Sequence, residues 1–295
     1  MKMIDSSPLL LNGREVANEV LKNIKVEIDK VKTAGIKRLP GLAVLLIGDD
    51  PASQTYVTNK ERASNKLGIY SEVYRLKSTV SEKELIEKIK QLNYDKRIDG
   101  ILLQLPLPKQ LNPQKLINEI DPQKDVDGLH PINLGKLMAG QPCLKPCTPL
   151  GVIEILKHYS IDITGLQTVI IGRSILVGKP LAMLLLEKNA SITVLHSKSK
   201  NIDKATKNAD LLISAIGKPQ IVKRSWIKEG AIVIDVGINK VVEDGANKLT
   251  GDVDFNNVKD ICKAITPVPG GVGPVTIAML MLNTLEAYKN NNQNG

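Results

Sequence analysis

A phenol and an amine stand four residues apart near the start of an expected helix. Tyr56 and Lys60 follow the chain-breaking residues 48–51, and Ser53 can cap a helix that runs to about Leu67. Side chains at i and i+4 share one helix face, so the two groups together can orient a substrate and move protons. Taken alone, such a pair is more often a surface feature, and it becomes a candidate site only with suitable neighbours.

Two further polar positions offer such neighbours. Gln104 interrupts the apolar run 101–105 at the end of an expected strand, which is where α/β sheets bind ligands. A buried amide at that place must find hydrogen-bond partners. Asp125 and Asp127 follow in a long polar segment. Aspartates in such segments commonly form turns or helix caps, and we expect that structural role for Asp125.

A second group of candidates begins in residues 168–180, which are predicted to form a strand, a tight turn and a helix. Gly172 at the strand end lets the backbone approach a phosphate, and the start of the helix offers unpaired N–H groups. Ser174 stands where the usual GxGxxG pattern has its second glycine. By pattern alone, an ordinary joint between a strand and a helix explains the segment equally well.

The end of the next strand indicates which nucleotide would bind. NAD-binding domains carry an acid there to hold the ribose hydroxyls, whereas this strand ends in His196, Ser197 and Lys198. The guanidinium of Arg173 together with a hydroxyl suits a 2′-phosphate, which predicts NADP. We expect His196 to be structural and Lys198 to be a solvated surface charge.

Later strand ends contribute glycines and one acid. Gly217 and Gly237 end the next two strands, on the side of a doubly wound sheet that lines a cofactor site. Asp235 precedes Gly237, and a loop-fixing role for this carboxylate is at least as consistent with the pattern as a catalytic one.

The elements that position these residues alternate in type, which predicts parallel sheets covered by helices. We therefore expect an α/β protein of two domains with a cleft between them. Residues 1–148 would form an α/β catalytic domain joined by the C-terminal helix 274–295, and residues 149–273 a Rossmann-like, doubly wound NADP-binding domain. The Pro-, Gly- and Asp-rich segment 106–149 is expected to be a long functional loop. Thr148 and Pro149 would start the next helix, and the polar tail 290–295 would be disordered.

We expect six helices and strands in residues 1–148 and five in residues 149–273, followed by the C-terminal helix. In the first domain they are a helix from about Val16 to Gly35, strands at 42–47, 70–76 and 98–105, and helices at 53–67 and from Ser81, where Glu84 completes a capping box. In the second they are strands at 169–171, 192–195, 211–215 and 232–236 and a helix at 178–188, followed by the final helix at 274–288.

Composition excludes several other classes. The 295 residues include 40 Lys and Arg against 31 Asp and Glu, a formal charge of +9, but no arginine-rich stripe interleaved with aromatics, so we expect no nucleic-acid partner. Cys143, Cys147 and Cys262 fit free thiols in a reducing compartment better than disulfides or a metal site, and we expect no metal. No secretion signal or membrane span is expected, which favours a cytoplasmic protein.

Several motifs together resemble the bifunctional methylenetetrahydrofolate dehydrogenase/cyclohydrolase family. The resemblance covers residues from about 11 to about 288, in the family's order and spacing. The motifs are YVTNK at 56–60, GILLQLPLP at 100–108, KDVDGLHPIN at 124–133, PCTPLG at 146–151, GRSILVGKP at 172–180 and PVPGGVGPVT at 267–276.

The resemblance implies roles for individual residues. Lys60 matches the family's catalytic lysine, Tyr56 the tyrosine that faces the pterin, Gln104 the glutamine that orients the lysine, and Asp127 the aspartate that anchors the folate. The cofactor-binding residues it implies are Gly172, Arg173, Ser174, Ser197, Ile238 and Thr148. The further substrate-binding residues it implies are Leu103, Leu105, Pro269, Gly270, Gly271, Val272 and Gly273.

The implied activity is oxidation of 5,10-methylenetetrahydrofolate with NADP, followed by hydrolysis of the methenyl product to 10-formyltetrahydrofolate. The resemblance also implies a homodimer. The alternative is a dehydrogenase that lacks the hydrolytic activity or prefers NAD. A nucleotide-binding regulatory protein without turnover is a more distant reading, because Tyr56, Lys60, Gln104 and Asp127 are all present.

Overall fold

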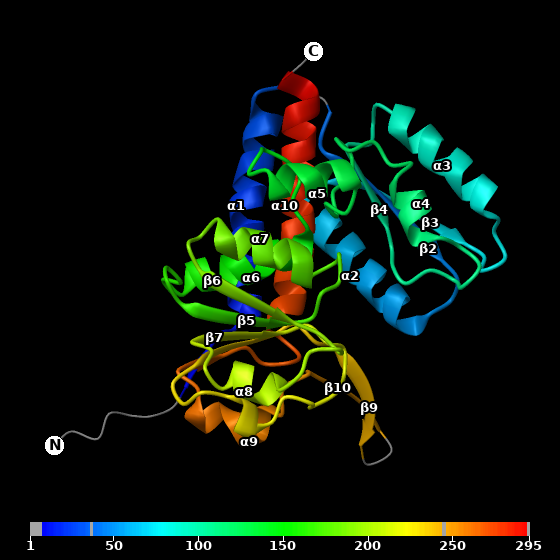
Figure 1. Ribbon diagram of the computed structural model, residues 1–295. Helices are drawn as coiled ribbons and strands as arrows, with labels where there is room; N and C mark the ends of the chain where they lie inside the picture. The colour runs from blue at the N-terminus through cyan, green and yellow to red at the C-terminus, as the bar shows by residue number, and fades with distance from the viewer. Residues whose placement is uncertain (1–7, 36–37, 244–245, 294–295) are drawn as a thin grey trace. The chain divides into compact units, whose positions relative to one another are not determined.

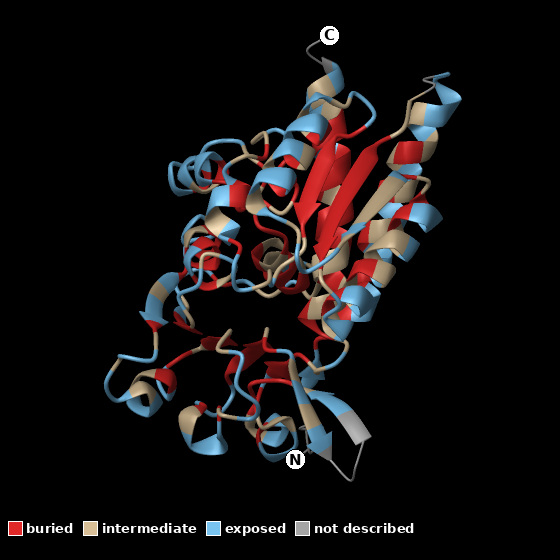
Figure 2. Cartoon of the chain, turned by 90° about the vertical axis from the view of Figure 1, so that its right-hand side faces the viewer, coloured by how far each residue is buried: buried red, intermediate tan, exposed pale blue. Residues whose placement is uncertain are grey.

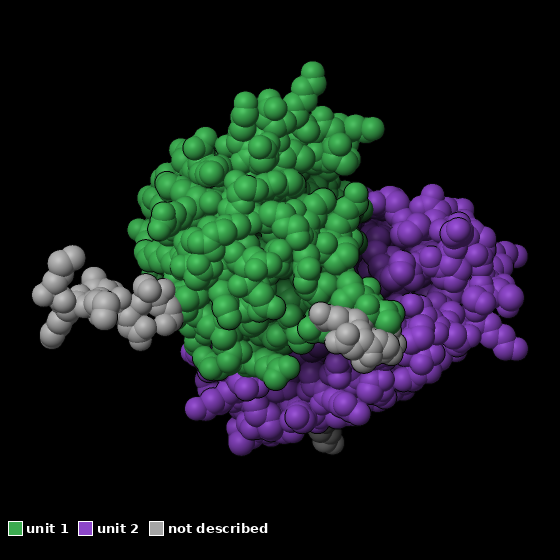
Figure 3. All heavy atoms as spheres, turned by 90° about the horizontal axis from the view of Figure 1, so that it is seen from below, with its two compact units in different colours: residues 1–17, 148–276 green, residues 18–147, 277–295 purple. Residues whose placement is uncertain are grey.

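The computed structural model describes residues 8–35, 38–243 and 246–293, and its chain forms two compact units (Figure 3). Unit 1 takes the chain up to Ala17 and from Thr148 to Thr276, and unit 2 takes it from Asn18 to Cys147 and from Ile277 onward. The N-terminal segment thus groups with the second half of the chain. The reason is that β1 (Leu9–Leu10) pairs in parallel with β11 (Ala264–Ile265).

Unit 2 is built on a three-stranded parallel sheet with the order β3-β2-β4. The central strand β2 (Gly41–Ile47) is buried along its whole length, as in a parallel sheet that is covered on both faces. β3 (Tyr70–Leu76) and β4 (Gly100–Leu103) flank it. Figure 2 shows the buried residues in red. The strand expected at 98–105 is shorter in the structure, so Gln104 lies immediately beyond the sheet.

Helix α2 (Pro51–Leu67) carries Tyr56 and Lys60. Its N-cap is Asp50, whose carboxylate accepts from the backbone N–H of Ser53 at 2.7 Å, so the expected cap at Ser53 is wrong. A carboxylate followed by proline at the first helical position starts the helix earlier. Gly68 ends it with φ 80°.

The other long helices of unit 2 agree with the sequence pattern. The expected capping box of α3 (Glu82–Tyr94) is present, with Ser81 and Glu84 bonded reciprocally. α1 (Gly13–Thr33) and α10 (Val272–Gln293) lie side by side (Figure 1), and Lys289 Nζ is 3.4 Å from Glu27 Oε2. The final helix continues through residues 290–293, so a disordered tail from 290 was wrong for these residues, while 294 and 295 lie outside the described part.

The long segment 106–149 is more ordered than expected. It contains two short helices, α4 (Pro113–Ile117) and α5 (Pro131–Met138), each with proline at its start and a capping side chain, Asn112 and His130. These caps stabilise the two helices, which are too short to show a clear hydrophobic period in the sequence.

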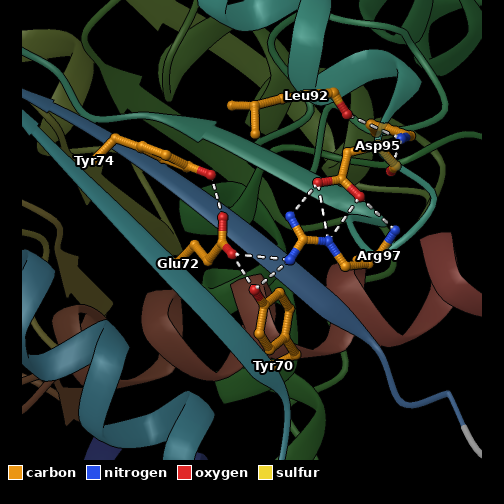
Figure 4. Close-up of polar contacts among 7 residues, drawn as sticks. Tyr70, Glu72, Tyr74, Leu92, Asp95 and Arg97 are labelled. Atoms are coloured by element: carbon orange, nitrogen blue, oxygen red, sulfur yellow. Dashed lines mark hydrogen bonds and ion pairs between the residues drawn. The ribbon is translucent and has the colours of Figure 1, made fainter.

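The edge strand β3 carries a polar network (Figure 4). Glu72 accepts hydrogen bonds from the hydroxyls of Tyr70 and Tyr74, and Arg97 pairs with Asp95 at 2.7 Å and with Glu72 at 3.5 Å. The network ties the free edge of the sheet to the turn that leads into β4. Charged and hydroxylated side chains on an edge strand also oppose pairing with other chains.

Unit 1 is built on a six-stranded parallel sheet with the order β1-β11-β8-β7-β5-β6. Its main strands are β5 (Gln167–Ile171), β6 (Ser191–Leu195), β7 (Leu211–Ser214) and β8 (Ile232–Asp235). With β11 these five run in the flavodoxin-like order 2-1-3-4-5, so the strand order reverses between β5 and β7. The carboxyl ends of β5 and β7 therefore form the switch point where such sheets bind ligands.

Helices cover both faces of this sheet. Figure 1 shows α6 (Cys147–His158) and α7 (Gly178–Leu186) on one side and α8 (Ile202–Thr206) and α9 (Phe255–Val258) on the other. α6 begins at Cys147, before the expected cap Thr148, which therefore lies within its first turn. The remaining elements are the hairpin β9 (Asn239–Glu243) and β10 (Ala246–Thr250) and the 3-10 turns Arg224–Trp226 and Lys259–Ile261.

Among the residues that the structure describes, no helix combines the length and apolar composition needed to cross a membrane. Within the same residues, no three His, Cys, Asp or Glu side chains group in a way that would hold a metal ion.

Candidate active site

The amine and the amide that the sequence singled out are in contact. Lys60 Nζ in α2 donates to Gln104 Oε1 across 2.8 Å. Gln104 is itself fixed, because its backbone N–H donates to Leu45 O at 2.9 Å and its Nε2 to Leu105 O at 2.6 Å. The second bond turns the amide oxygen toward the amine. Tyr56 lies one helical turn before Lys60, and burial raises the pKa of its phenol.

A carboxyl and a thiol share the surroundings of the amine. Burial lowers the pKa of Lys60, and the negative charge of Asp127 opposes this shift. Burial raises the pKa of Asp127, while Lys60 and a hydrogen bond from Cys147 pull it back. The Cys147 thiol has a pKa well above its usual value, mainly because it is buried, so it is protonated at neutral pH. The structure thus brings Lys60, Gln104 and Asp127 together in unit 2.

The loop that carries Asp127 is held from two sides. Asp125 accepts from the backbone N–H of His130 at 2.8 Å and from Asn133 at 2.9 Å, which confirms its loop-fixing role. Asn283 in α10 donates to the carbonyl oxygens of both Val126 and Lys145 at 2.8 Å. It thereby joins the backbone before Asp127 to the backbone before Cys147.

This arrangement can perform proton transfer on a bound ligand. An amine whose pKa is lowered by burial has a larger neutral fraction near pH 7 and can accept a proton from water. The neutral amide of Gln104 aims the amine without adding a charge that would raise its pKa. The carboxyl of Asp127 can accept hydrogen bonds from a nitrogen-rich ring.

The glycines of the expected phosphate turn in unit 1 are sterically required. A β-carbon on Gly172, which has φ 138°, would stand 2.4 Å from Ala215 O, and one on Gly178 would stand 2.0 Å from Gly172 O. Gly178 therefore permits the close approach of α7 to the strand end that the third glycine of a dinucleotide motif provides. Ser174 Oγ accepts from the backbone N–H of Val177 at 3.1 Å and shapes the turn. α7 has no side-chain cap, but the backbone N–H of Lys179 donates to Ser174 O at 3.0 Å and Pro180 has no N–H, so Gly178 is the residue of the first three that can offer its N–H to an anion.

Arg173 and Ser197 lie just beyond the ends of neighbouring strands. β5 and β6 pair in register at Ile171 and Leu195, and both side chains are exposed. A guanidinium and a hydroxyl at adjacent strand ends suit a phosphate group. His196 is structural, as expected, because its Nδ1 accepts from the backbone N–H of Lys198 at 3.2 Å.

The remaining expected residues are distributed as follows. Ile238 and the segment 269–273 are both in unit 1, and the Ile238 side chain reaches Gly273, whose added β-carbon would lie 3.5 Å away. Thr148 contacts Thr276 through their hydroxyls at 3.2 Å. Leu103 is 4% exposed and belongs to the core of unit 2, and Leu105 packs against that core, so Leu103 can offer a ligand little but its backbone.

A separate hollow of about 310 Å³ in unit 1 holds none of the expected site residues. Its lining residues are Gln220, Val241, Lys248, Leu249, Thr250, Phe255, Asn256, Pro267 and Val268.

A doubly wound sheet with a glycine turn at its switch point, together with a second α/β unit holding a half-buried lysine, amide and carboxyl, defines a two-domain enzyme of the nucleotide-dependent dehydrogenase class. Residues 11–127 match the model of the tetrahydrofolate dehydrogenase/cyclohydrolase catalytic domain, and residues 146–292 match that of the NAD(P)-binding domain of the same family. The chain belongs to the tetrahydrofolate dehydrogenase/cyclohydrolase family.

Individual relatives agree with the family models. The bifunctional protein FolD of Acetivibrio thermocellus is 51% identical over 280 residues, which make up 95% of this chain and 96% of that protein. The crystal structure of the bifunctional FolD enzyme of Campylobacter jejuni is 45% identical, with a TM-score of 0.92 over 97% of this chain and 100% of the other. The enzyme of Trypanosoma brucei, solved with NADP and an inhibitor, is 35% identical. Its TM-score is 0.94 over 97% of this chain and 99% of the other.

These findings confirm the expected fold class, a catalytic α/β domain with a Rossmann-like NAD(P)-binding domain. They also confirm the expected kind of enzyme, a bifunctional methylenetetrahydrofolate dehydrogenase and methenyltetrahydrofolate cyclohydrolase of one-carbon metabolism.

Three polar residues near these sites were not singled out from the sequence. Cys147 was interpreted only as a free thiol, and Asn283 and Asp252 received no role. Asn283 could have been noticed as an amide on the buried face of an otherwise apolar helix, since a buried amide needs partners. Asp252 stands in a Gly-Asp turn sequence that gives no comparable signal.

Proposed function

We propose that Lys60, Gln104, Asp127 and Tyr56 serve both reactions on one bound folate, and that the nucleotide oxidant is NADP. The observation that carries the proposal is the hydrogen bond between Lys60 and Gln104, beside the carboxyl of Asp127. The substrate is 5,10-methylenetetrahydrofolate and the final product is 10-formyltetrahydrofolate, a one-carbon donor for purine synthesis.

In the oxidation, the bound nicotinamide supplies the hydride acceptor. The folate nitrogens N5 and N10 stabilise the cation that develops at the carbon between them, so the protein mainly holds and orients the substrate. Asp127 accepts hydrogen bonds from the pterin, and Tyr56 covers the ring. Positioning of this kind can lower the activation barrier by about 7–11 kcal/mol.

In the hydrolysis, water attacks the cationic methenyl carbon. The first proton that this water loses passes to the neutral amine of Lys60. The bond from the carbon to N5 then breaks as the remaining hydroxyl proton moves to N5 and the formyl C=O forms, and Lys60 returns its proton to solvent. The lowered pKa of Lys60 supports this role, because a larger part of the amine is neutral before water attacks. The positive charge of the methenyl substrate would lower that pKa further.

The residues at the switch point of unit 1 fit a dinucleotide that carries a 2′-phosphate. Gly172, Ser174 and the uncapped start of α7 would hold the diphosphate, and Arg173 with Ser197 the 2′-phosphate. Ile238 and Thr148 would contact the cofactor. The further folate-binding residues that the family resemblance implies are Leu103, Leu105 and the segment 269–273.

We further propose a homodimer in the cytoplasm. The dimer rests on the family resemblance, and the location is supported by Cys143, Cys147 and Cys262, which form no disulfide and are typical in this respect of a reducing compartment. Light scattering coupled to size-exclusion chromatography would give twice the chain mass of 32.2 kDa for a dimer.

The proposed reactions can be followed on one sample. Purified protein with methylenetetrahydrofolate and NADP should produce NADPH, and added methenyltetrahydrofolate should lose its absorbance. NADPH formation without faster methenyl loss would indicate the dehydrogenase-only alternative. A higher kcat/KM with NAD than with NADP would refute the proposed cofactor.

A further inference from the structure

Asp252 occupies an unusual place in unit 1. Its side chain is fully buried, and its two carboxylate oxygens accept five hydrogen bonds. The donors are Ser214 Oγ at 3.1 Å, the backbone N–H groups of Ile216, Gly217 and Lys218 at 2.7, 3.2 and 3.0 Å, and Asn239 Nδ2 at 3.0 Å.

Three of these donors are consecutive N–H groups of the turn after β7. Successive backbone N–H groups that converge on one point form a concave anion-binding site, which in many proteins holds a phosphate. Here the carboxylate of Asp252 fills that concavity. The shape of the turn 216–218 therefore depends on this one side chain.

Asp252 also controls the turn after β8. Asn239, which donates to Asp252, directly follows Ile238. Gly237 passes so close that an added β-carbon would stand 2.1 Å from Asp252 Oδ1. Asp252 is thus in contact with both ends of the segment 237–239.

A second carboxyl fixes Asp252 itself. Asp235 accepts from the backbone N–H groups of Gly237 and Asp252 at 3.0 Å and of Val253 at 2.8 Å, so the loop-fixing role considered for Asp235 is present. Gly251 allows this approach, since a β-carbon there would stand 1.9 Å from Asp235 Oδ2.

The two turns held by Asp252 lie at the cofactor edge of the sheet. β7 is the strand next to β5 at the point where the strand order reverses. Ala215, at the start of the turn after β7, also has its carbonyl oxygen against Gly172 of the phosphate turn. The position of the turn after β7 therefore limits the space open to a dinucleotide.

We propose that Asp252 is a positioning residue for the nicotinamide cofactor, holding the turns after β7 and β8 in the form that binds NADP. This inference rests on the proposed function, because it takes the cofactor to bind at these turns. It predicts that disturbing Asp252 weakens cofactor binding and spares the hydrolysis of methenyltetrahydrofolate, which consumes no cofactor.

The test compares Asp252→Asn with Asp203→Asn, the same chemical change at an exposed position of unit 1. In Asp252→Asn the side-chain amide would point its own N–H groups at backbone N–H groups. We expect the loss of one charge-assisted hydrogen bond to raise the Kd for NADPH about tenfold, as measured by fluorescence titration. Methenyl hydrolysis by Asp252→Asn should match the wild type, and Asp203→Asn should leave both quantities unchanged.

A second pair of variants, with smaller changes, tests the inference if Asp252→Asn fails to fold. Asn239→Ala removes only the bond to Asp252, and Asn257→Ala removes an equally long bond, 3.0 Å, to Asp254 elsewhere in unit 1. Asn239→Ala should raise the Kd for NADPH and Asn257→Ala should not. An unchanged Kd in Asn239→Ala, or equal loss of binding and hydrolysis in a folded Asp252→Asn, would overturn the inference. Failure of the proposed function would show differently, as absence of both activities in the wild type.

Discussion

Lys60 and Gln104 are joined by a hydrogen bond of 2.8 Å between an amine and a side-chain carbonyl oxygen, although 44 residues separate them in the chain. The partner of the amine is a neutral group. A carboxylate in its place would stabilise the protonated amine and oppose the effect of burial on its pKa. The choice of an amide is therefore consistent with an amine that works as a base.

Replacing this amide by an acid should move the pH dependence of hydrolysis. In Gln104→Glu the carboxylate raises the pKa of Lys60, so the rate of methenyl hydrolysis should rise with pH through a higher midpoint than in the wild type. A rise of one pKa unit lowers the rate at pH 7 about tenfold. Gln91→Glu, at an exposed position of α3, is the control, and an unshifted profile in Gln104→Glu would contradict the assigned role.

Removing the guanidinium at the phosphate turn should change cofactor preference. Arg173→Ala loses charge-assisted bonds to the 2′-phosphate, which NAD lacks, so the KM for NADP should rise about tenfold or more while that for NAD changes little. The comparison variant is Lys198→Ala, for which we expect a smaller effect because this lysine is a solvated charge. Steady-state kinetics with both nucleotides would show the difference, and equal changes in the two KM values would mean that the 2′-phosphate binds elsewhere.

The amide of Asn283 should matter for the folate side of the enzyme. Asn283→Ala leaves the carbonyl oxygens of Val126 and Lys145 without this donor, at a cost of roughly 1–3 kcal/mol in the free energy of unfolding. Because Val126 precedes Asp127, the KM for folate should rise in both reactions, with NADPH affinity unchanged. Asn292→Ala, at an exposed site on the same helix, provides the control. A variant that lost stability but kept its folate KM would limit Asn283 to a purely structural role.

Asp235 should make the stability of the folded protein fall as pH rises from about 4 to about 7. Burial raises its pKa from 3.8 to about 7, so between these values the folded protein holds a proton that the unfolded chain has lost. The contribution of this group to the free energy of unfolding is then fully present below about pH 4 and decreases by up to about 1.4 kcal/mol per pH unit as pH rises toward 7. Urea denaturation at several pH values should show a flatter dependence in Asp235→Asn, and an identical slope would contradict the raised pKa.

Much of the fold follows from local pattern. Buried strands such as 42–47 and helices with clear caps, such as the one that starts after Ser81, were predicted because periodicity and capping are short-range signals. The two-residue strands β1 and β11 could not be predicted, since two residues show no period and their pairing joins the N-terminus to the last strand of unit 1. The short helices α4 and α5 were missed for the same reason.

Some residues of the site could likewise be predicted from the sequence and others could not. Lys60 and Gln104 stood out because a polar residue at a strand end and a shared helix face are visible in the sequence. The individual folate and NADP roles came from the family resemblance, not from spacing. Asp252 was not predicted, because its five donors come from the turn after β7 and from the strands β7 and β9, which only the tertiary structure brings together.

The most direct measurement of the central claim follows both reactions in one cuvette with Lys60→Met. With methylenetetrahydrofolate and NADP, the variant should still form NADPH, while the methenyl product accumulates because hydrolysis falls by about 10²–10⁴-fold without the amine. Methenyl absorbance that decays as fast as in the wild type, or NADPH formation lost to the same degree as hydrolysis, would contradict the role assigned to Lys60.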